Sequence, residues 1–201
     1  MSQPLQQSQQ VRPPAVAGLF YPAEPARLRA DVGAMLEAAR PATGDGAPAP
    51  AALIVPHAGY VYSGPTAALA WVRAEALRGT VRRVIVLGPA HRVDVRALAL
   101  PGCRAMDTPL GPVSVEVPPQ IEALAATGLV VSRPDVHAAE HSLEVQLPFL
   151  TVVLPGAAVV PLAVGRVSPE RAAGAIRPFL GRTDTLVVIS SDLSHYLPRA
   201  E

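Results

Sequence analysis

The stretch Leu53-Ile54-Val55-Pro56-His57-Ala58-Gly59-Tyr60 decides the predicted fold. Its first half is a short apolar run rich in β-branched residues, which is typical of a strand buried on both faces in a parallel sheet. Its second half ends that run abruptly at a histidine and a glycine. The same pattern returns at residues 84–91 and again at residues 186–195. These segments predict parallel strands over 51–55, 82–87 and 185–189.

Each of the three predicted strands is followed by a histidine, namely His57, His91 and His195. In open α/β sheets, ligands bind in the crevice outside the carboxyl ends of the strands. Imidazole is the commonest metal ligand in proteins and the usual general base near neutral pH. One such histidine alone is more simply explained as a loop residue bonded to backbone. Their shared placement favours a histidine-built site, metal-binding in character, at the carboxyl edge of the sheet.

The rest of the chain alternates helical and extended patterns. Apolar residues at helical spacing predict helices over 24–40, 65–77, 118–127, 140–154 and 168–180, with Ser63 as an N-cap and Pro148 as a kink. Strands are predicted over 129–132 and 159–164. Short segments within 95–117, separated by Pro-Gly and Gly-Pro, predict an antiparallel excursion. The predicted fold class is α/β, a mostly parallel central sheet flanked by helices with a small antiparallel excursion.

Composition narrows the class of protein. The 201 residues suit one domain, predicted over 11–201 after a disordered, Gln-rich tail at 1–10. The last predicted strand lacks a following helix to cover it, so the domain is expected to be truncated at its C-terminus. A net charge of +1 gives no electrostatic footprint for nucleic acid, and no apolar run is long enough to span a membrane. The single cysteine suits a reducing, cytoplasmic setting.

Further polar residues lie in short motifs. Asp192 follows the last strand. It either orients an imidazole or ligates the metal directly, or it merely caps the backbone of a turn. Glu140 and His141 are interpreted as a charged helix start near an anion site. The sequence His137-Ala138-Ala139-Glu140-His141 also matches the H-x-x-E-H pattern of inverted zinc peptidases, with Glu144 as a downstream carboxylate, although a chance match is the better interpretation. Cys103 is interpreted as a packed or surface residue.

Taken together, the motifs resemble those of the Memo family, known in prokaryotes as AmmeMemoRadiSam system protein B. The matching pieces are collinear along the chain: Ala17-Gly18-Leu19-Phe20-Tyr21-Pro22, Val55-Pro56-His57-Ala58-Gly59-Tyr60, Leu87-Gly88-Pro89-Ala90-His91, Glu140-His141-Ser142-Leu143-Glu144-Val145-Gln146-Leu147-Pro148 and Ser190-Ser191-Asp192-Leu193-Ser194-His195. Each piece is weak alone, but jointly they are specific.

The resemblance implies a fold like that of the class III extradiol dioxygenases, which use non-haem Fe(II). It implies that His57 and His91 are metal ligands for Fe(II) or copper, and that His195 is the acid–base residue. Glu140, His141 and Asp192 are implied to lie in or near the same catalytic pocket. The third ligand is a carboxylate in the dioxygenases and a cysteine in Memo proteins. It is expected in a C-terminal portion that this sequence lacks, and Cys103 does not correspond to it.

Three functions are compatible with these residues. The first is a metal-dependent redox or dioxygenase-like protein whose cleft takes a small molecule or a peptide. The second is a non-catalytic binding module for acidic or phosphorylated partners, or an accessory protein to a radical-SAM system. The third is a zinc hydrolase that uses His137, Glu140 and His141. No nucleic-acid or membrane partner is expected, and the sequence does not indicate substrate, native metal or oligomeric state.

Overall fold

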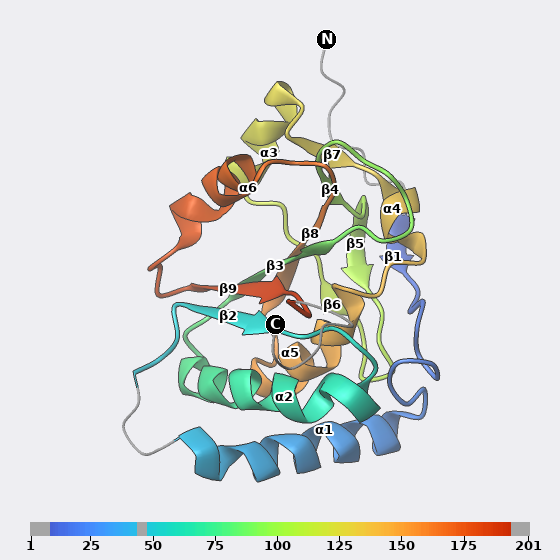
Figure 1. Ribbon diagram of the computed structural model, residues 1–201, viewed down its shortest axis with the longest axis vertical. Coiled ribbons are helices and arrows are strands. Elements are labelled where there is room, and N and C mark those ends of the chain that lie inside the picture. The colour runs from blue at the N-terminus through green and yellow to red at the C-terminus, as the bar shows by residue number, and fades with distance from the viewer. Residues whose placement is uncertain (1–8, 44–47, 194–201) are drawn as a thin grey trace, which may run out of the picture.

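The computed structural model describes residues 9–43 and 48–193, and within them a six-stranded sheet forms the centre of the molecule (Figure 1). The strands lie in the order β2-β9-β3-β8-β4-β7. Their bounds are Ala52–Val55 for β2, Thr185–Ser190 for β9, Arg83–Pro89 for β3, Ala158–Val164 for β8, Leu98–Leu100 for β4 and Val130–Ser132 for β7.

The sheet is mostly parallel, as predicted. β2 pairs with β9, β9 with β3, and β3 with β8, all in parallel register. β4 runs antiparallel to β8 and parallel to β7. Val55 pairs with Ser190, and Leu87 pairs with Ile189. The carboxyl ends of β2, β9 and β3 therefore meet at one edge of the sheet.

A smaller three-stranded sheet contains the predicted antiparallel excursion. β1 (Gln9–Arg12) pairs in parallel with β5 (Cys103–Met106), and β5 pairs antiparallel with β6 (Val113–Ser114). Residues 98–100, within the region predicted as the antiparallel excursion, instead form β4 of the central sheet. Residues 1–8 of the predicted tail lie outside the described residues, whereas Gln9 and Gln10 belong to β1.

Helices cover both faces of the central sheet. In Figure 1, α1 and α2 lie together on one side with α5 between α2 and the sheet, and α3 and α6 lie on the other. The bounds are Pro25–Ala39 for α1, Tyr60–Trp71 for α2, Pro119–Glu122 for α3, Pro134–Ala138 for α4, Leu147–Val153 for α5 and Pro169–Ile176 for α6. Short 3₁₀ helices are η1 (Arg40–Thr43), η2 (Val72–Leu77), η3 (Ala123–Thr127), η4 (Glu144–Gln146) and η5 (Arg177–Phe179).

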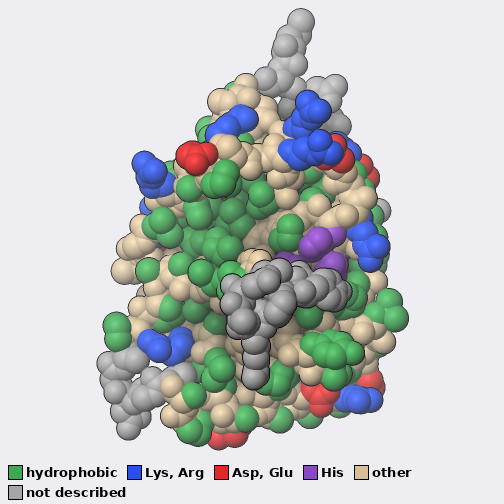
Figure 2. Space-filling view, viewed as in Figure 1, with side chains coloured by type: hydrophobic (Ala, Val, Ile, Leu, Met, Phe, Trp, Pro, Cys, Tyr) green, Lys and Arg blue, Asp and Glu red, His purple; other side chains and the backbone are tan. Residues whose placement is uncertain are grey.

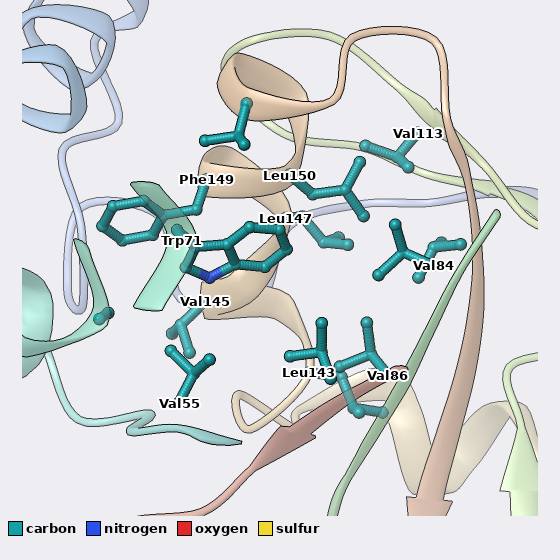
Figure 3. Packing of buried hydrophobic residues seen from close by; sticks show 14 of the residues in the cluster. Val55, Trp71, Val84, Val86, Val113, Leu143, Val145, Leu147, Phe149 and Leu150 are labelled. Atoms are coloured by element: carbon teal, nitrogen blue, oxygen red, sulfur yellow. The ribbon is translucent and has the colours of Figure 1, made fainter. Parts of the chain in front are cut away.

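The core on the α2 and α5 side is built around two stacked aromatic rings (Figure 3). Trp71 and Phe149 are fully buried, with ring centroids 6.3 Å apart and planes 5° from parallel. Val55 and Val86 of the sheet belong to the same buried cluster. Burial of apolar side chains of this size contributes roughly 1.5–3 kcal/mol each, so this face is a main source of stability. None of the helices in the described part of the chain combines the length and hydropathy needed to cross a bilayer.

Two predicted helix starts are wrong. Ser63 is not an N-cap, because α2 begins earlier, at Tyr60, and its N-cap is Gly59. The Tyr60 N–H donates to the Phe20 carbonyl. Residues 140–143 are not helical either. Glu140 draws the backbone N–H groups of His141 and Ser142 onto its own carboxylate, and the helix starts only beyond them. Pro148 consequently lies in the first turn of α5 rather than at a kink.

Candidate metal centre

Three histidine side chains meet where the strands end. His57 follows β2, His91 follows β3, and His141 lies in the loop between α4 and η4. The ring centroids of His57 and His91 are 5.3 Å apart, and that of His141 is 5.7 Å from His57 and 4.7 Å from His91. One ligand atom from each ring lies within 4.8 Å of the others. The three histidines could therefore hold one metal ion.

The Glu140 carboxylate supports two of these histidines, His91 and His141, through hydrogen bonds. One carboxylate oxygen accepts from the His91 backbone N–H at 2.6 Å. The other lies 2.9 Å from His91 Nδ1 and accepts from the backbone N–H groups of His141 and Ser142. Burial opposes ionisation of this carboxyl, but the bonds from His91 and Ser142 lower the pKa of Glu140 to about 2. It is therefore a carboxylate at neutral pH, and a carboxylate behind an imidazole is the usual support of a metal ligand.

The ring of His141 lies close to both Glu140 and Phe20. Its Nδ1 is 3.4 Å from a Glu140 oxygen, and this buried atom makes no hydrogen bond within the described residues. The rings of His91 and His141 are stacked, 15° from parallel, and both direct Nδ1 toward the same carboxylate. Their Nε2 atoms are thus the ones not engaged by Glu140. The ring of Phe20 packs against that of His141, with centroids 4.6 Å apart, and gives it an apolar neighbour.

His57 is the most enclosed of the three histidines, with 3% of its surface exposed. Its backbone N–H donates to Asp192 Oδ1 at 2.5 Å, and Asp192 Oδ2 lies 3.7 Å from its Nε2. Its Nδ1 lies 3.1 Å from Ser190 Oγ. Burial lowers the pKa of His57 despite the nearby Asp192 carboxylate, and burial likewise lowers the pKa of His141. Neutral imidazoles, which have a free lone pair, are the form that binds metals.

Other residues considered from the sequence have different roles or lie elsewhere. His137 is buried in α4, and its Nε2 bonds the Ala99 carbonyl. Because α4 ends at Ala138 and Glu144 is bound to Arg12, the zinc-hydrolase hypothesis is wrong. Cys103 is buried in β5, and burial raises the pKa of its thiol. His195 lies outside the described residues.

An apolar groove adjoins the site. A cavity of about 530 Å³ is lined by residues of β3, β8, β9 and α6, among them Leu87, Pro89, Ile176 and Ser190. The space-filling view shows histidine side chains at the surface, beside a broad hydrophobic area (Figure 2). Because 37% of the His91 side chain is exposed, the histidine cluster is open to solvent on one side.

Comparison with known proteins agrees with this arrangement. The family model described as Memo-like protein matches residues 12–201. The chain belongs to the Memo-like family. A MEMO1 family protein from Sulfolobus acidocaldarius is 35% identical over 202 residues, covering 94% of this chain and 71% of that protein. One from Aquifex aeolicus is 37% identical over 200 residues, covering 95% of this chain and 70% of that protein.

Membership of the Memo-like family confirms the resemblance read from the motifs. It also accounts for the fold, since this family is built like the extradiol dioxygenases. The structure adds a feature that sequence reasoning missed, because it brings His141 into the ligand cluster of His57 and His91, whereas the third ligand was expected in a C-terminal portion. The sequence signal for His141 as a ligand is its position directly after Glu140, whose carboxylate bonds the backbone of this loop.

Proposed function

We propose that this Memo-like protein binds iron or copper through His57, His91 and His141 and has a redox or dioxygenase-like role. The observation that supports the metal site is the convergence of three imidazoles, each from a different segment, with ligand atoms within 4.8 Å of one another. Imidazole suits iron, copper and zinc alike, so the choice of a redox metal follows from the family rather than from these residues.

The donor set fits such an ion. Burial lowers the pKa of His57 and of His141, which favours the neutral imidazoles that bind metals, and Glu140 supplies the carboxylate support that metal-binding histidines commonly have. Three protein donors leave coordination positions open, as in non-haem iron sites. A bound iron or copper ion would supply one-electron redox chemistry at this edge of the sheet.

The surrounding residues would then act on a ligand in the crevice. Asp192, 3.7 Å from His57 Nε2, is placed to accept a proton or to orient a polar group. Phe20 excludes water from one side of the cluster. The adjoining groove would take the apolar part of a small molecule or peptide. His195 is the further acid–base candidate, carried over from the resemblance to the dioxygenases.

Metal analysis tests the proposal. Purified protein is loaded anaerobically with Fe(II), or with copper, desalted and assayed for metal. We expect about one ion per chain, and its loss in the variants His57→Ala, His91→Ala and His141→Ala. His137→Gln is the matched control, because the buried His137 ring bonds the Ala99 carbonyl and is not one of the three clustered histidines, so its replacement should leave metal content unchanged. Unchanged metal content in both His57→Ala and His91→Ala would remove the proposal.

A second candidate is a non-catalytic module that binds an acidic or phosphorylated partner, or serves a radical-SAM system. It draws support from the open groove beside the half-exposed His91. Binding of a phosphopeptide that persists in the metal-free His57→Ala, His91→Ala double variant would favour it. Cytoplasmic location and the lack of nucleic-acid and membrane partners stay predictions from the sequence.

A further inference from the structure

We propose that a buried hydrogen-bond chain from Trp71 through Gln146 to Ser190 fixes the proton of His57 on Nδ1 and leaves Nε2 as its ligand atom. Gln146 and Ser190 are then positioning residues for the metal centre, a consequence that rests on the proposed function. The tautomer itself follows from donors and acceptors alone, because each group in the chain has a limited capacity to donate or accept.

The chain begins in the hydrophobic core (Figure 3). The indole N–H of Trp71 can only donate, and it lies 3.1 Å from Gln146 Oε1. The amide nitrogen of Gln146 lies 2.9 Å from the Pro56 carbonyl, which can only accept. A flipped amide would set donor against donor at Trp71 and acceptor against acceptor at Pro56. The orientation of Gln146 is therefore determined, and its second N–H points to Ser190 Oγ at 2.9 Å.

Ser190 is the link that decides the tautomer. Its hydroxyl has one proton to donate and two lone pairs to accept with. The Ser142 carbonyl oxygen lies only 2.5 Å from Ser190 Oγ, a separation that two oxygens sustain only with a proton between them. The hydroxyl proton is thus committed to Ser142, and one lone pair is committed to Gln146. Toward His57 the Ser190 oxygen can only accept.

His57 Nδ1, 3.1 Å from that oxygen, must therefore carry the ring proton. Asp192 favours the opposite tautomer, with the proton on Nε2, because its Oδ2 lies 3.7 Å from His57 Nε2 and would attract a proton there. A proton on Nε2 would block the lone pair that faces the cluster. The Ser190 contact opposes this outcome and keeps Nε2 free.

Burial makes the chain effective. Trp71, Gln146, Ser190 and His57 are each exposed by 3% or less, so water does not compete for their bonds. In such a low-dielectric setting an unsatisfied donor or acceptor is costly, and the whole pattern of donors is maintained together. The packing of Trp71 in α2 is in this way connected to the ligand atom of His57 at the end of β2.

The test reads the tautomer in metal-free protein. Long-range ¹H–¹⁵N NMR correlations of the imidazole rings distinguish a proton on Nδ1 from one on Nε2, with His57→Ala giving the assignment. We expect wild-type His57 to be protonated on Nδ1. Ser190→Ala should shift the proton toward Nε2 and weaken metal binding roughly 10–100-fold, the usual effect of losing a partner of a ligating histidine. Ser190→Thr, which keeps the hydroxyl, should restore both.

Thr185→Val is the control, since it removes a buried hydroxyl from the other end of the same strand and should change neither property. A wild-type His57 protonated on Nε2 overturns the inference, and this result does not depend on whether the Ser190 variants fold. Ser190→Ala with wild-type tautomer and affinity overturns the role of Ser190, as does an equal effect of Thr185→Val. If the His57→Ala variant keeps its metal while wild-type His57 is protonated on Nδ1, the proposed metal site is refuted but the tautomer inference stands.

Discussion

Glu144 offers the sharpest test of how this fold is stabilised. Its side chain is fully buried and accepts four hydrogen bonds. One oxygen takes the Arg12 guanidinium and the Ala15 N–H, and the other takes the Val16 N–H and the Tyr21 hydroxyl. In Glu144→Gln the shape is kept, but the new NH₂ group faces a group that can only donate whichever way the amide lies, either the Val16 N–H or the Arg12 guanidinium and the Ala15 N–H.

The magnitude follows from what is left unpaired. The substitution removes the counter-charge of Arg12, which is 4% exposed, and breaking a buried ion pair by removing one partner costs about 3–5 kcal/mol. For a protein of this size that loss lowers Tm by roughly 6–20 °C. Asp94→Asn is the control, because the Arg166–Asp94 pair is largely exposed and such pairs contribute about 0–1 kcal/mol.

Urea unfolding followed by circular dichroism measures both variants against the parent protein. The comparison is informative if all three unfold in a single transition with the same m-value. A Glu144→Gln variant within 1 kcal/mol of the parent would refute the reasoning, since it would mean that the Arg12 charge finds water or another partner at little cost.

Three further predictions concern stability. Burial lowers the pKa of His137 to about 4 from 6.5, so the unfolded chain binds the proton more tightly, and the free energy of unfolding should fall by up to about 3 kcal/mol as the pH drops from 6.5 to 4. In His137→Gln this part of the pH dependence should vanish in urea titrations, and an unchanged slope would contradict the assignment. Gly165→Ala should destabilise by about 3 kcal/mol or more, because the added Cβ would lie 1.9 Å from the Val95 carbonyl oxygen. Gly174→Ala, inside α6 with open space around it, should instead stabilise by about 0.5–1 kcal/mol in the same assay.

The central sheet could be predicted from the sequence because its strands carry their own signal. Runs such as 84–87 and 186–189 are apolar throughout and mostly β-branched, a composition typical of a strand covered on both faces. Once those strands are parallel neighbours, the histidines that follow β2 and β3 must come to one edge. The proximity of His57 and His91 is thus a consequence of strand direction, which local sequence reveals.

The region 137–146 could not be predicted in the same way. From Glu140 onward, apolar residues recur at helical spacing, which predicts a helix that starts at Glu140. What prevents that helix is a set of partners distant in sequence. Arg12 donates to the carbonyls of His137 and Glu140, and Glu140 itself turns toward the backbone of His91. Such tertiary hydrogen bonds override local helix propensity and leave no periodic trace in the sequence.

These same partners explain why one short segment supports so much of the site. Glu140 holds His91 and the backbone of His141, Glu144 binds the N-terminal segment through Arg12, and Gln146 holds Ser190 behind His57. A continuous helix would place residues 140, 144 and 146 at fixed angles on one cylinder and would satisfy the backbone N–H groups internally. As a loop followed by a 3₁₀ turn, the segment directs three polar side chains to three separate parts of the molecule. The cost is a set of buried charges, and the site stays assembled only while every one of them keeps its partner.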